Sequence, residues 1–154
     1  MPKIFGNQIN LSQKDQIAKL MSEVKCTLKP STVHGIGVFS LFDVKKGDRL
    51  YCVPPSTNRI FYNVPWSSLS KLWPEVKEMI ISRWPSIING SMFLHPNDEV
   101  WLASWINHSE NFNYSQATDT ATRDIKAGEE ITESYRIMDN AEEIYPFLKD
   151  LTKT

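Results

Sequence analysis

The apolar residues of this chain fall into short runs bounded by Gly and Pro, and only a few segments show helical spacing. Near the N-terminus, Ile17, Leu20 and Met21 recur three and four residues apart, which places them on one face of a helix. Ser12, followed three residues later by Asp15, is typical of a helix N-terminus. We therefore predict a helix that begins at Ser12, continues just past Met21 and serves as a docking extension.

The runs that follow predict an antiparallel β element. Two apolar runs about ten residues apart, joined by a Gly turn, are typical of paired strands. The predicted strands and turns are Val24–Leu28 stopped by Pro30, a turn at His34–Gly37, Val38–Phe42, a turn at Lys45–Asp48, and Arg49–Val53 ended by Pro54.

Residues 59–90 differ in character and predict a helical insert between β segments. Their apolar residues recur near helical spacing, and Ser67 or Ser68 can cap the helix. Pro74 sits early in the pattern, so the helix starts near Trp73 or bends there.

The remainder of the chain returns to short elements. Its predicted elements are Ser91–His95 with Val100–Ser104 as a hairpin or as a strand and a short helix, a Thr-rich strand at 117–125, a strand at Glu130–Thr132, and a helix from Asn140 that Pro146 interrupts.

These elements predict one domain with two extensions, because 154 residues fit a single core. We place an N-terminal extension at 1–23, the main domain at 24–137 and a C-terminal segment at 138–154. Two stretches of the main domain, 43–50 and 124–131, share one pattern of strand end, Gly turn and new strand. They predict two β corners of similar geometry.

The composition excludes several classes of function. The net charge is −1 and the pI is about 6.3, which gives no basic face for direct nucleic-acid binding. Cys26 and Cys52 lack CxxC spacing, so they predict neither a metal site nor a disulfide framework. No apolar run approaches the length of a membrane span, and the N-terminus lacks a secretory h-region. We expect a soluble intracellular protein, in the cytoplasm or, in a eukaryotic host, the nucleus.

Three short motifs carry the candidate chemistry, and each has an ordinary structural reading. Gly35 and Gly37 precede a strand, which fits either a turn or a backbone lying against a cofactor. Asn107-His108-Ser109 follows a Trp-rich apolar stretch. It fits either a turn whose Asn and Ser side chains hydrogen-bond to their own backbone or a buried polar site. Tyr135 alone fits a packing tyrosine.

Read in order, these motifs resemble the SET domain of protein lysine methyltransferases. The chain has Gly35-Ile36-Gly37-Val38-Phe39, then Asn107-His108-Ser109, then Arg123-Asp124-Ile125-Lys126-Ala127-Gly128-Glu129-Glu130-Ile131, then Tyr135. The resemblance extends from about Val24 to Arg136. It implies a mostly β, β-clip-like SET fold with a helical insert, an N-terminal helix and a C-terminal helical segment, in which a pseudoknot builds the site.

The resemblance also implies a cofactor, a substrate and a set of site residues. S-adenosyl-L-methionine would be the methyl donor, and a protein that presents a lysine would be the substrate and partner. Tyr135 would stand where the methyl group meets the lysine amine. The cofactor-binding residues would be His34, Gly35, Ile36, Gly37, Asn107 and His108. Phe61, Tyr62, Phe93 and Trp101 are candidates for the lysine channel, with plain core packing as the other reading.

The sequence departs from the family around the Asn-His-Ser motif. Glu110 and Phe112 replace a Cys and a Pro of many members, and no Cys follows Cys52, so the zinc site that closes those members is not expected. The cover would then come from the C-terminal segment, with Tyr145, Pro146, Phe147 and Leu148, or from a second protomer in a homodimer.

Two further expectations concern the product and the class of protein. The stretch 113–123 is short and is expected to lack the family's typical β-hairpin, and neither Thr120 nor Ala121 supplies an aromatic that would limit methylation. We therefore expect the pocket to admit more than one methyl group. The alternative to an enzyme is a non-catalytic SET-like binding module.

Overall fold

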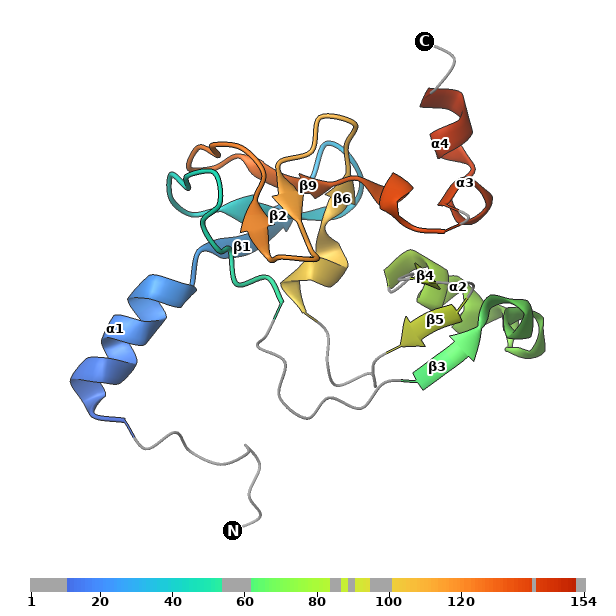
Figure 1. Ribbon diagram of the computed structural model, residues 1–154, viewed down its shortest axis with the longest axis horizontal. Helices are drawn as coiled ribbons and strands as arrows, with labels where there is room; N and C mark the ends of the chain where they lie inside the picture. The colour runs from blue at the N-terminus through green and yellow to red at the C-terminus, as the bar shows by residue number, and fades with distance from the viewer. Residues whose placement is uncertain are drawn as a thin grey trace.

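Short strands and a few helices make up the structure, a computed structural model that describes residues 11–53, 62–83, 87–88, 91–94, 101–139 and 141–151. The described residues form a four-stranded, a three-stranded and a two-stranded sheet (Figure 1). The expectation of a mostly β fold with helical segments is confirmed. No helix in these described ranges has the length and apolar character that crossing a membrane requires.

The main sheet has the strand order β1-β2-β9-β6. Strands β1 (Cys26–Pro30) and β2 (Ile36–Ser40) form a hairpin, each displaced by two residues from its predicted range. The turn between them contains Gly35 at a φ of 52°, a left-handed conformation that glycine adopts without strain. Strand β9 (Glu130–Glu133) pairs antiparallel with β2.

Strand β6 (Asn107–His108) lies parallel to β9 on its other side. The register sets Asn107 opposite Thr132 and His108 opposite Glu133. A parallel pair joins segments that are far apart in the chain, and this one brings the Asn-His-Ser motif against the strand that leads to Tyr135.

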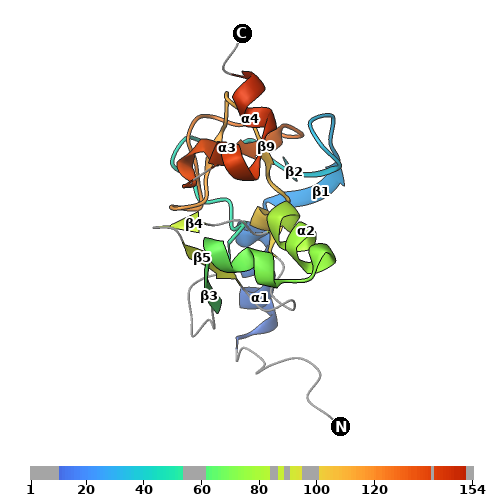
Figure 2. The same ribbon diagram turned by 90° about the vertical axis from the view of Figure 1, so that its right-hand side faces the viewer.

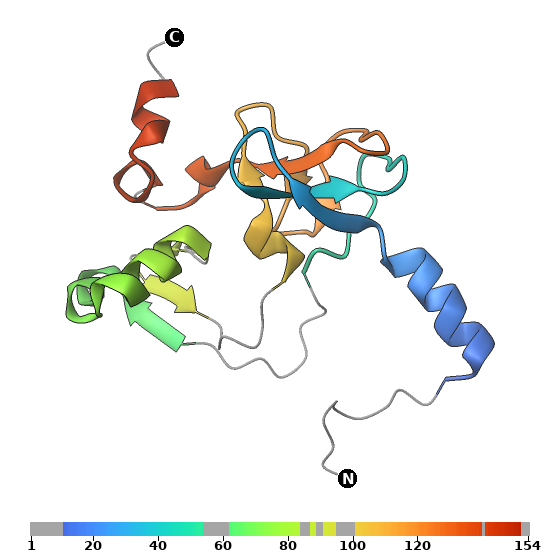
Figure 3. The same cartoon turned by 180° about the vertical axis from the view of Figure 1, so that it is seen from behind.

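The insert forms its own small sheet beside the main one (Figures 1 and 3). Its elements are β3 (Tyr62–Pro65), the 3-10 helix η1 (Trp66–Lys71), α2 (Pro74–Arg83), β4 (Ile87–Ile88) and β5 (Ser91–Leu94), with the sheet order β3-β5-β4. Helix α2 begins at Pro74, the position where proline's missing N–H costs nothing. The predicted cap by Ser67 or Ser68 is wrong, because these residues lie inside η1, which starts after Pro65 without a side-chain cap.

Helix α1 (Gln13–Glu23) begins as predicted. The Ser12 side chain accepts a hydrogen bond from the Asp15 backbone N–H at 3.1 Å. The helix extends away from the main sheet and buries none of its side chains (Figure 1). Its apolar residues Ile17, Leu20 and Met21 are therefore exposed.

Three sequence predictions in the main domain are wrong. Residues Arg49–Val53 form no strand, because Tyr51 adopts a φ of 56° and only Arg49 pairs, with Thr120. The strand predicted at 117–125 is reduced to β8 (Thr120–Ala121). Strand β8 pairs with β7 (Tyr114–Ser115), so the stretch between Asn113 and Arg123 does contain a short hairpin.

The side chain of Asp119 explains the first of these differences. It is buried, and its carboxylate accepts hydrogen bonds from the Cys52 N–H at 2.9 Å, the Tyr114 hydroxyl at 2.9 Å and the Arg49 guanidinium at 2.9 Å. The backbone N–H of Cys52, which a strand would pair with another strand, is satisfied here by a side chain.

The two predicted corners meet each other. Val44 and Ile125 exchange both of their backbone hydrogen bonds, each 2.9 Å long. The Asp43 carboxylate accepts from the Ala127 N–H at 2.9 Å, and the Asp124 carboxylate accepts from the Lys46 N–H at 3.0 Å. Each corner therefore supplies the aspartate that satisfies the turn of the other.

Two hydrophobic cores hold these parts together. The main core gathers buried residues from the main sheet, both corners and the short hairpin, including Val38, Leu50, Tyr114 and Ile131. A second core joins Leu69 and Ile80 of the insert to Ile144. Ile144 belongs to α3 (Ala141–Ile144), so the C-terminal segment packs on the insert.

The C-terminal segment follows η3 (Tyr135–Ile137) and consists of α3 and α4 (Phe147–Asp150). Pro146 separates the two helices, as predicted. Figure 2 shows these helices stacked above the insert and beside β9.

Candidate functional site

The side chain of Asn107 joins the two distant motifs of the sequence. It is buried, and its Nδ2 donates to the backbone carbonyls of His34 at 3.0 Å and Ile36 at 3.3 Å and to Glu130 Oε1 at 2.9 Å. Among the described residues no donor faces its Oδ1. The amide therefore fixes the glycine loop through its nitrogen and leaves an acceptor oxygen beside that loop.

The carboxylate of Glu130 also holds the glycine loop in place through hydrogen bonds. Its two carboxylate oxygens accept from the Ser31 hydroxyl at 2.7 and 2.9 Å, and Ser31 Oγ accepts from the Val33 N–H at 2.9 Å. A Cβ on Gly37 would collide with this carboxylate. Gly37 is therefore needed for a close approach within the protein, whereas a Cβ on Gly35 would meet open space.

His108 is held by hydrogen bonds at both ring nitrogens. Its Nδ1 accepts from the Tyr135 backbone N–H at 3.0 Å, and its Nε2 lies 3.3 Å from Glu110 Oε1. Because Nδ1 is an acceptor, the ring proton of the neutral imidazole sits on Nε2 and points to the carboxylate. The ring is almost fully buried, with 5% of its side chain exposed.

The hydroxyl of Tyr135 donates to the carbonyl of Ile106 at 2.6 Å. Burial, assisted by the charge of nearby Glu133, raises the pKa of Tyr135 to about 12. The phenol therefore stays protonated at neutral pH, with its proton directed to Ile106 and its oxygen lone pairs free to accept.

Aromatic rings of the C-terminal segment cover this pair. The ring of Tyr145 lies 4.8 Å from that of Tyr135, and the ring of Phe147 lies 5.9 Å from that of His108. Burial raises the pKa of Tyr145 well above its usual range. The four rings form an aromatic wall, of which Phe147 remains about half exposed.

Arg136 fastens the C-terminal segment to the site. Its Nε donates to Glu110 at 2.7 Å, and its two terminal nitrogens donate to Glu142 at 3.2 Å and to the Leu148 carbonyl at 2.9 Å. The Arg136 guanidinium, with a smaller contribution from His108, holds the pKa of Glu110 below its usual range. The ion pair between Arg136 and Glu110 therefore ties the C-terminal segment to the site. We call this set of contacts the Arg136 clamp.

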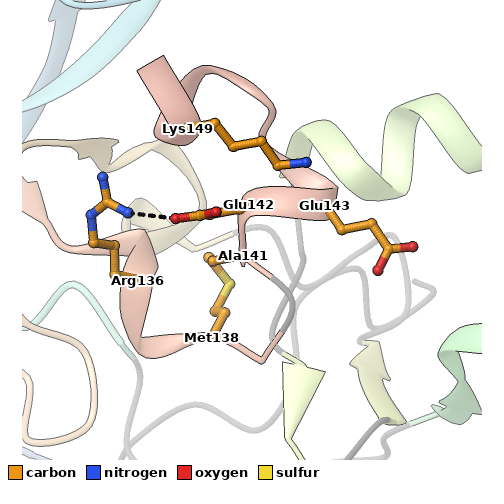
Figure 4. A pocket seen from close by; sticks show the side chains of 6 residues that line it. All are labelled: Arg136, Met138, Ala141, Glu142, Glu143 and Lys149. Carbon is orange, nitrogen blue, oxygen red and sulfur yellow. Dashed lines mark hydrogen bonds and ion pairs between the residues drawn. The ribbon is translucent and has the colours of Figure 1, made fainter. Parts of the chain in front are cut away.

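An open pocket of about 420 Å³ lies over the clamp (Figure 4). Its lining combines two cationic and two acidic side chains with two apolar ones: Arg136, Lys149, Glu142, Glu143, Met138 and Ala141. None of the residues predicted for the cofactor or the lysine lines it. In the described part of the chain, no three His, Cys, Asp or Glu side chains are grouped as a metal site would require.

Asn113 connects the strand that carries the site to the short hairpin. Its side chain is 1% exposed, donates to the Glu130 carbonyl at 2.8 Å and accepts from the Thr132 N–H at 2.9 Å. Its backbone N–H donates to the Thr132 carbonyl at 3.1 Å, and its carbonyl accepts from the Thr122 N–H at 2.9 Å. Asn113 therefore links β9 to the short hairpin through both its side chain and its backbone.

The structure brings together most of the residues predicted for the site. The loop His34–Gly37 contacts Asn107, and His108 contacts Tyr135. Trp101 is half-buried and precedes the 3-10 helix η2 (Leu102–Trp105). Tyr62 of β3 pairs with Leu94 of β5, and Phe93 of β5 pairs with Asn63 of β3. The side chains of Tyr62 and Phe93, and all of Phe61, lie outside the described residues.

Sequence reasoning missed four residues that build the site: Glu130, Glu133, Asn113 and Arg136. Glu130 and Glu133 belong to a strand whose last three residues are all buried, although two of the four are acidic. A pair of acidic residues flanking Ile131-Thr132 was the available signal, since carboxylates are seldom buried without a role.

Residues 35–136, about two thirds of the chain, match a family model described as SET domain. The matched range begins at the glycine loop and ends one residue after Tyr135, so it contains both motifs that Asn107 and His108 connect. A comparison with curated proteins found no match.

Proposed function

The chain belongs to the SET domain family, whose usual role is protein lysine methylation, and on this premise we propose that it transfers a methyl group from S-adenosyl-L-methionine to the side-chain amine of a lysine in a protein. The observation that carries the proposal is the junction at Asn107 and His108. One of these residues fixes the glycine loop and the other positions Tyr135.

The residues around the glycine loop fit the proposed cofactor. The amino group of its methionine part needs acceptors, and the Asn107 Oδ1 offers one beside the exposed residues His34 to Ile36. Space is open beside Gly35. When bound, the cofactor supplies a methyl group on a positively charged sulfur. We therefore assign His34, Gly35, Ile36, Gly37, Asn107 and His108 to its binding.

Tyr135 contributes a fixed acceptor at the transfer position. Its proton points to Ile106, so its oxygen presents lone pairs to an incoming amine. A lysine with an ordinary pKa near 10.4 must lose a proton before it can react, which costs about 4–5 kcal/mol at pH 7. The aromatic wall lowers that cost, because desolvation disfavours the charged form of the amine.

The C-terminal segment shields part of this place from water, with Phe147 itself about half exposed. Tyr145 and Phe147 cover the rings of Tyr135 and His108, and the Arg136 clamp keeps them there. This arrangement supports a single chain that closes its own site. A homodimer stays a prediction, which light scattering after size exclusion would test.

A first experiment separates the enzyme from the non-catalytic SET-like module. Isothermal titration with S-adenosyl-L-methionine should give a saturable heat, whereas no binding at millimolar cofactor would favour the module. Incubation with labelled cofactor and a cell lysate should then label proteins on lysine, and mass spectrometry of the product would count the methyl groups. A product limited to monomethyl-lysine would contradict the expectation of more than one.

A variant tests the role of Tyr135. Tyr135→Phe keeps the ring against His108 and removes the hydroxyl, so it should reduce transfer about 100-fold or more while the cofactor affinity stays within about twofold. Tyr51→Phe is the matched control, because the Tyr51 ring faces Lys25 and Arg49. Full transfer by Tyr135→Phe would mean that another group occupies the transfer position. The channel residues Phe61, Tyr62, Phe93 and Trp101 stay predictions.

A further inference from the structure

Glu133, the last residue of β9, is buried, and no cation among the described residues pairs with its carboxylate. The residue is 7% exposed. Its Oε1 accepts one hydrogen bond, from the Gln116 backbone N–H at 2.7 Å, and no donor among the described residues contacts its Oε2. Burial raises the pKa of Glu133 to about 7, and no Lys, Arg or His of the described residues offsets that effect. A buried charge is costly unless it is paired.

The groups around this carboxylate are neutral, and their protons are used elsewhere. The charge of Glu133 contributes to a raised pKa at three of them: Tyr135, Tyr114 and Cys52. The Tyr135 hydroxyl donates to Ile106, the Tyr114 hydroxyl donates to Asp119, and the Cys52 thiol points to Cys26 and to the Leu50 carbonyl. None of these described neighbours supplies a positive charge to the Glu133 carboxylate.

The position of Glu133 shows where that charge would come from. The residue is the register partner of His108 and precedes Tyr135 by two positions. Because the His108 Nδ1 accepts from the Tyr135 N–H, this register sets Glu133 beside the His108–Tyr135 junction where methyl transfer is assigned. The protonated amine of a lysine is the cation that arrives there under the proposed function.

We propose that Glu133 receives the ammonium group of the target lysine and accepts its proton. This inference rests on the proposed function. In the step, an N–H bond of the ammonium breaks, its electron pair stays on nitrogen, and an O–H bond forms on the Glu133 carboxylate. A desolvated site favours the neutral acid and the neutral amine over the two separated charges. The nitrogen lone pair needed for methyl transfer is then available beside Tyr135.

The first test is a titration of the native chain that needs no turnover. Carbon-13 NMR of the labelled Glu133 carboxyl should give a midpoint near 7, and n-butylamine, a probe for the lysine side chain, should move that midpoint by about one unit. The neutral isostere n-butanol should leave it in place. An ordinary midpoint near 4, or a midpoint that n-butylamine does not move, would overturn the proposal.

The second test uses Glu133→Gln, which keeps the acceptor for Gln116 and loses the charge. Transfer should fall about 100-fold or more and lose its dependence on a group titrating near pH 7, with cofactor affinity unchanged. Glu78→Gln, on the exposed surface of α2, is the control. If Glu133→Gln keeps the native pH profile, the role of Glu133 fails while the proposed function stands. If the native chain transfers nothing but the NMR midpoint responds to n-butylamine, the proposed function fails and the amine site remains.

Discussion

Replacing Asn113 by alanine should remove much of the stability of the main domain. The side chain is 1% exposed and satisfies two backbone groups of β9, the Glu130 carbonyl at 2.8 Å and the Thr132 N–H at 2.9 Å. Alanine at this position leaves both groups without a partner in a place that water scarcely reaches. Each buried group that loses its hydrogen bond costs about 1–3 kcal/mol.

The two losses together give a decrease of about 2–6 kcal/mol in the free energy of unfolding. A domain of this size has about 5–15 kcal/mol in total, so the variant should be severely weakened. The melting temperature should fall by about 4–24 °C, since 1 kcal/mol corresponds to about 2–4 °C in a domain of this length.

Urea unfolding followed by circular dichroism measures the change. Asn111→Ala is the matched control, because Asn111 is exposed and lies two residues away on the same turn. It should change the free energy of unfolding by less than about 0.5 kcal/mol. If Asn113→Ala costs no more than this control, the side chain does not hold β9 and the reasoning is refuted.

Three further perturbations test the clamp, the glycine loop and the buried carboxylate. Arg136→Ala removes a charge-assisted hydrogen bond to the Leu148 carbonyl worth about 1.5–3 kcal/mol, so hydrogen exchange in the C-terminal segment should accelerate about 10-fold or more; unchanged exchange there would show that the clamp holds nothing. Gly37→Ala sets a Cβ against the Glu130 carboxylate and should lower both the melting temperature and the cofactor affinity; a native melting curve would show that the loop has room. Because burial raises the pKa of Glu133 from 4.5 to about 7, the folded state binds its proton more tightly than the unfolded state, and the stability gained is complete below about pH 4.5 and lost as the pH rises through 7. Relative to Glu133→Gln, the native chain should therefore lose on the order of 3 kcal/mol between about pH 4.5 and pH 8 in urea titrations, and a constant difference would place the carboxylate in water.

Local signals in the sequence predicted the elements that depend on neighbouring residues. The cap at Ser12, the start of α2 at Pro74 and the break at Pro146 each follow from the chemistry of one residue and its neighbours in the chain. The strand predicted at Arg49–Val53 failed because its N–H groups are satisfied by Asp119, far away in the sequence. No periodicity within a short window can report such a partner.

The candidate site likewise has a part that the sequence predicted and a part that it did not. The order of motifs predicted the junction of the glycine loop, Asn107, His108 and Tyr135, because the resemblance already contains the long-range pairing. It did not predict the buried Glu133 or the Arg136 clamp. The role of Glu133 depends on its burial, and the role of Arg136 depends on partners in the C-terminal segment.

The two interlocked corners have a consequence for how the chain can lengthen. The aspartates that join them, Asp43 and Asp124, contact groups 84 and 78 residues away, and the whole insert lies inside that loop. Closing a loop costs free energy that grows only with the logarithm of its length, about 0.6 kcal/mol for each doubling. Lengthening the insert outside the residues that pack on Ile144 should therefore cost little stability. Folding speed would change more than stability, because the corners can lock only after the ends of that long loop have met.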